Sequence, residues 1–354
     1  MSPNHANKSL PCGSLPEVIT PYLKQLIAST GGPQGPIGLQ FVAQPDMEQA
    51  HQEMTSDPLH EDEHEVAPAL IYKYRGEVEQ NGKVTRYGRV LWTVTRFCGS
   101  YCRFCTRGRE VGLPAGTTME SHARITQEPF LTEAEINQVF EYIKSHPEIN
   151  EVVLSGGDPL SSPRPYLTKI VQGLASLQQA GHLDVVRIGT RLPIVSPHAM
   201  QEWHYDLIRT LRNPYILLHI NHPAEVTAAV IAVAQKLRET SFASLLSQSV
   251  LLQGVNDKTD TLYELFNLLH KHAIRPYYLF QNDDVYWAKH FTVAPKRAIE
   301  IWKSLRPRLS GLAATARFVI DVEDGYGKIP VPEGDSWQVD LTHFRDFKGQ
   351  VHSW

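Results

Sequence analysis

The stretch Val90-Leu-Trp-Thr-Val-Thr-Arg-Phe-Cys-Gly-Ser-Tyr-Cys-Arg-Phe-Cys105 joins an apolar run to three closely spaced cysteines. Its first six residues are mostly β-branched or aromatic, which is typical of a buried strand. Cys98, Cys102 and Cys105 follow almost at once, and their thiolates are soft metal ligands. A strand that ends in three such ligands predicts a metal centre beside the end of that strand.

Short apolar runs alternate with longer segments of helical period from Val90 onward. This alternation is typical of repeated βα units around a parallel sheet, so we predict an α/β barrel. A helix over residues 133–143 follows this pattern, since Thr132 can cap its first turn together with the acidic side chain three positions later. The predicted strands are residues 90–95, 151–155, 185–189, 216–220, 249–252, 276–280 and 317–321.

Polar or glycine-containing segments follow nearly every predicted strand. In a parallel barrel these positions converge on one rim, where barrel enzymes place their chemistry. Ordinary polar loops leaving a sheet would explain any single segment, but the coincidence at six strand ends favours a site. The segments are residues 98–105, 155–158, 189–191, 219–222, 254–257 and 281–284.

The composition favours a small-molecule substrate. The chain has 354 residues, and 34 basic side chains nearly balance 38 acidic ones, so its charge gives no reason to expect a nucleic acid or a membrane surface as partner. No apolar run approaches the length of about 20 residues that spans a bilayer, and the polar start is unlike a signal peptide. We therefore expect a cytoplasmic protein. The four cysteines are not spaced as a disulfide framework, and Cys12 has no predicted role.

The chain is expected to have three parts. Residues 1–88 form an N-terminal extension that packs on the core, with a short helical pattern over residues 21–27. Residues 89–330 form the barrel. Residues 331–354 form a C-terminal tail.

The spacing Cys-x3-Cys-x2-Cys, with Phe104 before the last cysteine, resembles the signature of radical S-adenosylmethionine (SAM) enzymes. That resemblance implies a partial (βα)6-type barrel, the radical SAM fold. It also implies a 4Fe-4S cluster whose fourth iron, without a cysteine, binds SAM and cleaves it to a 5′-deoxyadenosyl radical. A zinc site made from three cysteines and a histidine is the alternative. Ser155, Gly156, Gly157 and Asp158 resemble the family segment that lies along the amino group of SAM.

Ordered matches over residues 57–331 make the chain similar to the lysine 2,3-aminomutase family. They include the segments at residues 57–62, 101–107, 154–158, 187–191, 219–223, 248–257 and 275–278. In that family a lysine of a glycine-rich segment holds pyridoxal 5′-phosphate (PLP) as a Schiff base, and Lys328 is the match. His219 and Gln248 match positions near SAM.

The PLP phosphate has two candidate sites before the first barrel strand. Lys73 and Tyr74 match the family's Arg-Tyr pair and Arg89 the arginine that follows it, but an insertion at about residues 76–85 makes Arg86-Tyr87 a competing match. The Asn-Gly within residues 80–83 also predicts a hairpin turn, which these basic residues would simply flank.

The resemblance implies that Arg107 binds the carboxylate of the substrate and that Asp283 and Asp321 bind the ammonium of its side chain. Two buried aspartates are costly unless a cation joins them, which favours a cationic amino acid. L-Lysine, converted to L-β-lysine, is the family's substrate, while arginine or ornithine would satisfy the same charges. A radical SAM enzyme without PLP, acting on a peptide or RNA, is the other alternative.

The resemblance also implies an electron donor such as flavodoxin or ferredoxin. A homo-oligomer is compatible with the family. However, the extra C-terminal cysteines that bind zinc at an oligomer interface in longer members have no counterpart after Cys105.

Overall fold

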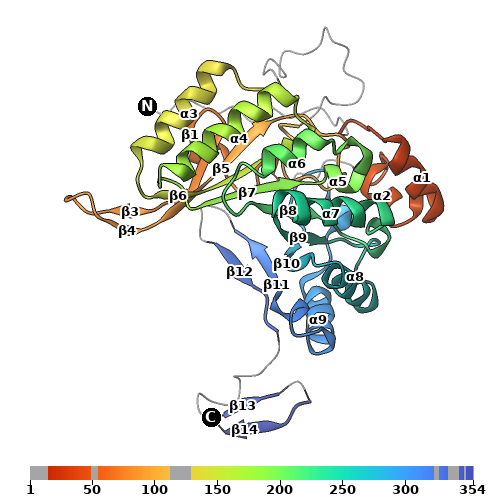
Figure 1. Ribbon diagram of the computed structural model, residues 1–354. Coiled ribbons are helices and arrows are strands. Elements are labelled where there is room, and N and C mark those ends of the chain that lie inside the picture. Colours follow the sequence, from red (N-terminus) through yellow and green to blue (C-terminus); the bar gives the residue numbers. More distant parts are fainter. Residues whose placement is uncertain are drawn as a thin grey trace, which may run out of the picture.

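The computed structural model describes residues 15–48, 55–111, 129–322, 327–333, 343–346 and 348–353. Their centre is one curved, ten-stranded sheet, and the helices that connect its strands lie along its outer face (Figure 1). Cys12 lies outside the described residues. Among the described helices, none is both long enough and apolar enough to cross a bilayer.

The sheet is a partial barrel in which seven neighbouring strands run parallel in chain order. This arrangement confirms the predicted α/β class and places all seven carboxyl ends on one side. The parallel strands are β5 (Gly88–Thr95), β6 (Ile149–Gly156), β7 (Val185–Thr190), β8 (Tyr215–His219), β9 (Ser244–Leu251), β10 (Arg275–Gln281) and β11 (Arg317–Asp321). Antiparallel strands extend both sides: β1 (Glu65–Ala67) and β2 (Leu70–Tyr74) precede β5, and β12 (Lys328–Pro330) pairs with β11.

Helices connect successive parallel strands. They are α3 (Glu133–Ser145), α4 (Arg164–Gln179), α5 (Leu192–Val195), α6 (Glu202–Ile208), α7 (Ala228–Ser241), α8 (Thr259–Lys271) and α9 (Pro295–Leu305). The predicted cap of α3 is confirmed, since Thr132 Oγ1 accepts from the Glu135 backbone N–H and the Glu135 carboxylate accepts from that of Thr132.

The main core lies between the sheet and these helices. Alternate strand residues such as Trp92, Leu154, Ile188 and Ile216 are completely buried there. Burial of each such side chain contributes about 1.5 to 3 kcal/mol. The residues between them face the opposite, concave side of the sheet, because strand side chains alternate. The core therefore fixes which residues point into the barrel.

The N-terminal segment contributes more regular structure than its sequence indicated. The helix predicted there is α1 (Pro21–Ser29), and its Leu23 and Ile27 pack with Phe41 of α2 (Gly38–Phe41) against Val195. Strands β1 and β2, neither of which was predicted from the sequence, join the main sheet. This segment therefore covers one side of the cysteine loop and lengthens the barrel wall.

Two small hairpins lie outside the main sheet. Strands β3 (Glu77–Val78) and β4 (Val84–Arg86) project from the body (Figure 1), and Gly82 in their turn has a φ of +85°. This confirms the hairpin predicted from Asn-Gly. Strands β13 (His343–Arg345) and β14 (Val351–Ser353) form the second hairpin, near the C-terminus.

Candidate active site

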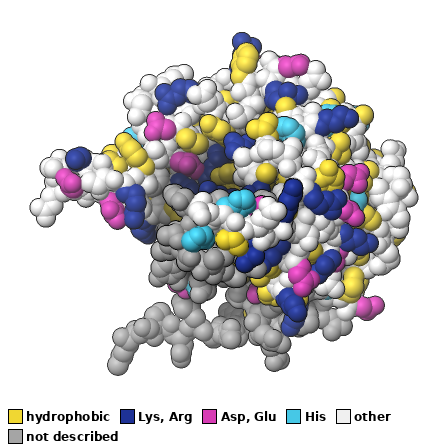
Figure 2. Space-filling model, turned by 90° about the horizontal axis from the view of Figure 1, so that it is seen from below, with side chains coloured by type: hydrophobic (Ala, Val, Ile, Leu, Met, Phe, Trp, Pro, Cys, Tyr) yellow, Lys and Arg dark blue, Asp and Glu magenta, His cyan; other side chains and the backbone are white. Residues whose placement is uncertain are grey.

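A cavity of about 260 Å³ opens on the concave face of the sheet. Its wall alternates along the strands: Leu91 of β5, Val153 and Ser155 of β6, and Leu217 and His219 of β8 face it, whereas the residues between them are in the core. The view from below shows a hollow lined by basic, acidic and apolar side chains (Figure 2). The cavity is therefore the interior of the partial barrel.

The barrel brings most of the predicted site residues to this one cavity. Those that line it are Lys73, Tyr74, Arg89, Arg107, Ser155, His219, Gln248, Asp283, Asp321 and Lys328. Gly156, Gly157, Asp158 and the three cysteines lie outside its lining.

The cysteines occupy the loop that follows β5. Burial raises the pKa of the Cys98 thiol well above its ordinary value and that of Cys105 to about 12. These thiols would therefore stay protonated without a cation, and three thiolate sulfurs are the donor set that iron–sulfur clusters use. In the part of the chain that the structure describes, no three His, Cys, Asp or Glu side chains converge on a single-ion position.

Two buried arginines hold the cysteine loop. Arg191 donates from Nη1 to Cys102 Sγ at 2.8 Å and from Nη2 to the Glu225 carboxylate at 2.6 Å. Arg103, which is completely buried, donates from Nε to Glu48 Oε1 at 2.8 Å. Because Glu48 belongs to the N-terminal segment, the second contact ties that segment to the loop.

Gly156 and Gly157 let the end of β6 lie directly against the cysteine loop. A Cβ on Gly156 would stand 2.4 Å from the Thr95 carbonyl, and one on Gly157 would stand 2.2 Å from that of Phe97. Gly156 also has a φ of +114°, which L side chains rarely adopt. In this structure the two glycines position the loop that carries the cysteines.

Asp158 is buried and its carboxylate is fully engaged. It accepts hydrogen bonds from the backbone N–H groups of Leu160, Arg191 and Leu192 and from the hydroxyl of Thr190. These donors come from the loop that follows β6, from the last residue of β7 and from the loop after it. In this structure the Asp158 carboxylate joins those loops, and its predicted contact with SAM stays a prediction.

His219 presents an unused polar atom. Its Nε2 is buried and has no hydrogen-bond partner among the described residues. Burial, together with the nearby Arg191 charge, lowers the pKa of His219 to about 3, so the ring is neutral. A buried unpaired nitrogen on a cavity wall indicates a position that a bound ligand satisfies.

Lys328 and Asp321 form an ion pair between the paired strands β11 and β12. Burial lowers the pKa of Lys328, although Asp321 opposes that shift. The hydroxyl of Tyr74 donates to Asp321 at 3.5 Å, and the Arg89 guanidinium lies 3.8 Å from the Tyr74 ring centre. This wall therefore combines an amine of weakened basicity with an aromatic ring and an arginine.

Of the two sequence matches for a phosphate site, only one faces the cavity. Lys73 Nζ donates to the Val322 carbonyl at 3.3 Å and lines the cavity with Tyr74. Arg86 is on the projecting hairpin with 59% of its side chain exposed, and Tyr87 is 60% exposed.

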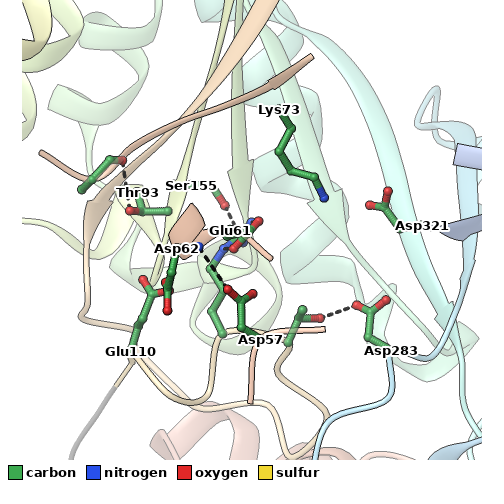
Figure 3. A network of polar contacts seen from close by, with 12 residues as sticks. Asp57, Glu61, Asp62, Lys73, Thr93, Glu110, Ser155, Asp283 and Asp321 are labelled. Atoms are coloured by element: carbon green, nitrogen blue, oxygen red, sulfur yellow. Dashed lines mark hydrogen bonds and ion pairs between the residues drawn. The ribbon is translucent and has the colours of Figure 1, made fainter. Parts of the chain in front are cut away.

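Arg107 and Asp283 both line the cavity. The close-up view shows Asp283 on the same side as Asp321, away from Glu61 and Ser155 (Figure 3). Arg107 donates to both oxygens of Glu61, from Nε at 2.7 Å and from Nη2 at 2.6 Å. Asp283 accepts from the Thr106 hydroxyl at 2.5 Å. Burial and the nearby Asp321 charge raise the pKa of Asp283 to about 6, although Thr106 lowers it.

Glu61, Thr106 and the role of Arg191 were not predicted from the sequence. Glu61 and Arg191 fall within the segments similar to the aminomutase family, and this similarity could have marked them as site residues. Their spacing in the sequence, however, does not show which side chains they contact. Thr106, between Cys105 and Arg107, lies in such a segment too.

A family model described as the radical SAM superfamily matches residues 92–266. L-Lysine 2,3-aminomutase of Clostridium subterminale is 33% identical over 341 residues, covering 96% of this chain and 74% of that protein. The L-lysine 2,3-aminomutase of Methanococcus maripaludis is 32% identical over 341 residues, covering 96% and 72%. Glutamate 2,3-aminomutase of Clostridioides difficile is 31% identical over 283 residues, covering 78% and 62%.

Radical SAM enzymes use a 4Fe-4S cluster and SAM, and the spacing of Cys98, Cys102 and Cys105 is consistent with that cluster. This favours the cluster over the zinc site. The relatives act, by their names, on small amino acids. With about a third of its residues identical to theirs along nearly its whole length, the chain belongs to the lysine 2,3-aminomutase family of radical SAM enzymes.

Proposed function

We propose that this chain is a PLP-dependent 2,3-aminomutase that converts L-lysine into L-β-lysine. The observation that carries the proposal is the charge layout of the cavity, in which Arg107 lies beside Glu61 and Ser155, and the two aspartates Asp283 and Asp321 lie away from them. An α-amino acid with a cationic side chain offers the opposite charges at both ends. Glutamate would bring a second carboxylate to the aspartates, which like-charge repulsion disfavours.

Asp283 is the acceptor that most needs a cation. Its raised pKa shows that the described residues leave its charge poorly compensated, whereas Asp321 already pairs with Lys328. The ammonium of a lysine side chain would supply that compensation. Arginine and ornithine carry the same charge, and the names of the relatives favour lysine over both.

Arg107 is the proposed partner of the substrate carboxylate. A guanidinium can bind a carboxylate through two parallel N–H groups, which fixes orientation as well as position. Ser155 Oγ lies 3.3 Å from Nη1 of Arg107 and marks the edge of the guanidinium that faces β6.

Lys328 is the proposed attachment point of PLP, with Lys73, Tyr74 and Arg89 around its phosphate. The residues fit this group, because a buried amine with a lowered pKa is more readily deprotonated and the basic and aromatic side chains lie on the same wall. When bound, PLP supplies a conjugated ring that delocalises an unpaired electron during nitrogen migration.

Cys98, Cys102 and Cys105 would hold the cluster. His219 and Gln248, with Ser155, Gly156, Gly157 and Asp158 nearby, are proposed to hold SAM, as the unpaired Nε2 of His219 supports. Together the two cofactors supply the radical that removes hydrogen from the substrate. An electron donor such as flavodoxin or ferredoxin would reduce the cluster.

The proposal is tested with protein purified without oxygen, loaded with iron, sulfide and PLP, and incubated with SAM and dithionite. Lysine, arginine, ornithine and glutamate are supplied separately, and β-amino acids are quantified by mass spectrometry. We expect β-lysine to form fastest. Faster turnover of glutamate would refute the charge argument, and faster turnover of arginine or ornithine would refute the choice of lysine. Radical modification of a peptide or RNA without PLP would refute the assignment of the chain as a PLP-dependent aminomutase.

A further inference from the structure

Glu61 is a buried carboxylate in the cavity wall that the substrate contacts proposed above do not use. Its side chain is 4% exposed. It directly follows His60, a non-glycine residue with a φ of +49°. Such a conformation persists where the surroundings enforce it, and it is frequent at functional sites. The chain therefore maintains a strained turn at His60, immediately before Glu61, and the carboxylate of Glu61 lies in the cavity wall.

Glu61 binds one edge of the Arg107 guanidinium and leaves another edge available. It accepts from Nε and from one hydrogen of Nη2, at 2.7 and 2.6 Å. A guanidinium has five N–H donors, so the two on Nη1 and the second on Nη2 remain. One Nη1 hydrogen is directed to Ser155 Oγ at 3.3 Å, a long contact. Arg107 can therefore keep Glu61 and still bind a second carboxylate through its Nη1 and Nη2 edge.

The neighbouring arginine has a different set of partners. Arg109 Nη2 lies 3.3 Å from Asp57, 2.7 Å from Asp62 and 2.8 Å from Glu110, which joins the turn before Glu61 to the loop after the cysteines. Figure 3 shows Asp57, Asp62 and Glu110 close to Glu61. Among the described residues, Glu61 is the carboxylate that pairs directly with Arg107.

The electrostatics keep Glu61 charged in place. Burial alone would raise the pKa of Glu61, but the Arg107 charge and hydrogen bonds, with smaller contributions from Arg109 and Lys73, hold it below its ordinary value. The pair is thus ionised throughout the physiological range, and protonation does not release Arg107.

We propose that Glu61 is the positioning residue of the carboxylate site: it fixes the plane of Arg107 so that the free edge of the guanidinium binds the carboxylate of an α-amino acid substrate. The inference rests on the proposed function, because it assigns Arg107 that role. It predicts that Glu61 acts only on substrates that have an α-carboxylate.

The test compares L-lysine with L-lysinamide, which lacks the carboxylate. Dissociation constants are measured by calorimetry on protein loaded with cluster and PLP but without SAM, so that no turnover occurs. Glu61→Gln replaces one acceptor oxygen with a donor and removes the charge. Asp62→Asn is the matched control, since it removes a charge from the adjacent residue, which contacts Arg109 instead.

For Glu61→Gln we expect lysine to bind about 10- to 100-fold more weakly, because the Arg107 guanidinium is then misplaced. The dissociation constant of lysinamide should stay within about twofold of the wild-type value. Asp62→Asn should change neither constant by more than about twofold. Three results would overturn the inference: unchanged lysine binding, equal weakening of lysine and lysinamide, or tighter lysine binding, which would mean that Glu61 occupies the place of the substrate carboxylate.

Two further measurements keep the outcome decisive. The iron and PLP contents of the variant and the wild type are compared first. If Glu61→Gln does not take up the cluster and PLP, it is replaced by Glu61→Asp, which keeps the charge but has a shorter side chain. For Glu61→Asp we expect the same result: weaker binding of lysine and unchanged binding of lysinamide. If wild-type protein does not bind lysine, the proposed function fails. The Glu61 inference is then tested with the amino acid that does bind and its amide.

Discussion

Lowering the pH should selectively weaken the binding of lysine, because the proposed ammonium acceptor Asp283 titrates close to neutrality. Burial, with the Asp321 charge, raises its pKa from an ordinary value of 3.8 to about 6 in the ligand-free protein. A cation can bind the ionised carboxylate strongly, whereas the protonated acid offers it little.

The size of this effect follows from the pKa. Asp283 should be about nine-tenths ionised at pH 7 and about one-tenth ionised at pH 5, so lysine should bind about tenfold more weakly at pH 5. His219 does not titrate in this interval, since its pKa is about 3. L-Norleucine has no side-chain ammonium, but its carboxylate and α-amine match those of lysine, so titration elsewhere in the site affects both ligands alike.

The assay is calorimetry at pH 5, 6 and 7 on protein loaded with cluster and PLP in the absence of SAM. The ratio of the norleucine to the lysine dissociation constant should rise about tenfold from pH 5 to pH 7, as the ionised fraction of Asp283 does. Asp283→Asn should make that ratio independent of pH. A flat ratio in the wild type, or an equal rise in Asp283→Asn, would refute the assignment of Asp283.

Asp283→Asn should also stabilise the ligand-free protein by about 3 kcal/mol at pH 7, because a carboxyl whose pKa rises from 3.8 to about 6 on folding destabilises the fold progressively as the pH rises through that interval; denaturant unfolding at pH 3 should show almost no gain, since the group is then largely protonated in both states. Borohydride reduction followed by peptide mass spectrometry should place a pyridoxyl group on Lys328, and Lys328→Ala should retain none; a label elsewhere would exclude Lys328. Asp158→Ala should lower the free energy of unfolding by about 3 kcal/mol, since the buried N–H groups that donate to this carboxylate lose their acceptor. Denaturant titration measures the loss, and a much smaller value would show that water replaces the carboxylate. Glu48→Gln should cost about 3 to 5 kcal/mol and speed proteolysis of residues 15–48, because it leaves Arg103 buried without its counter-charge; unchanged proteolysis would show that this pair does not hold the segment.

The parallel strands could be predicted because each places apolar residues in the core. Residues 90–95, for example, lie within β5 (Gly88–Thr95), whose inner face also contributes to the cavity. Once the strands are arranged in order, their carboxyl ends must meet, so Ser155 and His219 were predicted to lie on one rim. Strand β2 (Leu70–Tyr74) was missed because its short run stands alone, outside the repeating pattern.

Specific pairs could not be predicted, because tertiary structure selects among many possible partners. Arg107 and Glu61 are 46 residues apart in sequence, and several carboxylates closer in sequence were equally plausible partners. Asp158 shows the same limit, since its predicted contact was with SAM, whereas the folded loops supply donors for its carboxylate. Sequence spacing thus located the site but left its internal contacts undetermined.

Migration of nitrogen tests the central claim most directly. Protein loaded with cluster and PLP is incubated without oxygen with SAM, dithionite and L-lysine labelled with ¹⁵N at the α-amino group, and the product is followed by NMR and mass spectrometry. We expect the label on the β-carbon of β-lysine over many turnovers for each SAM molecule present. Cleavage of one SAM for each lysine consumed, with no labelled β-lysine, would contradict the account.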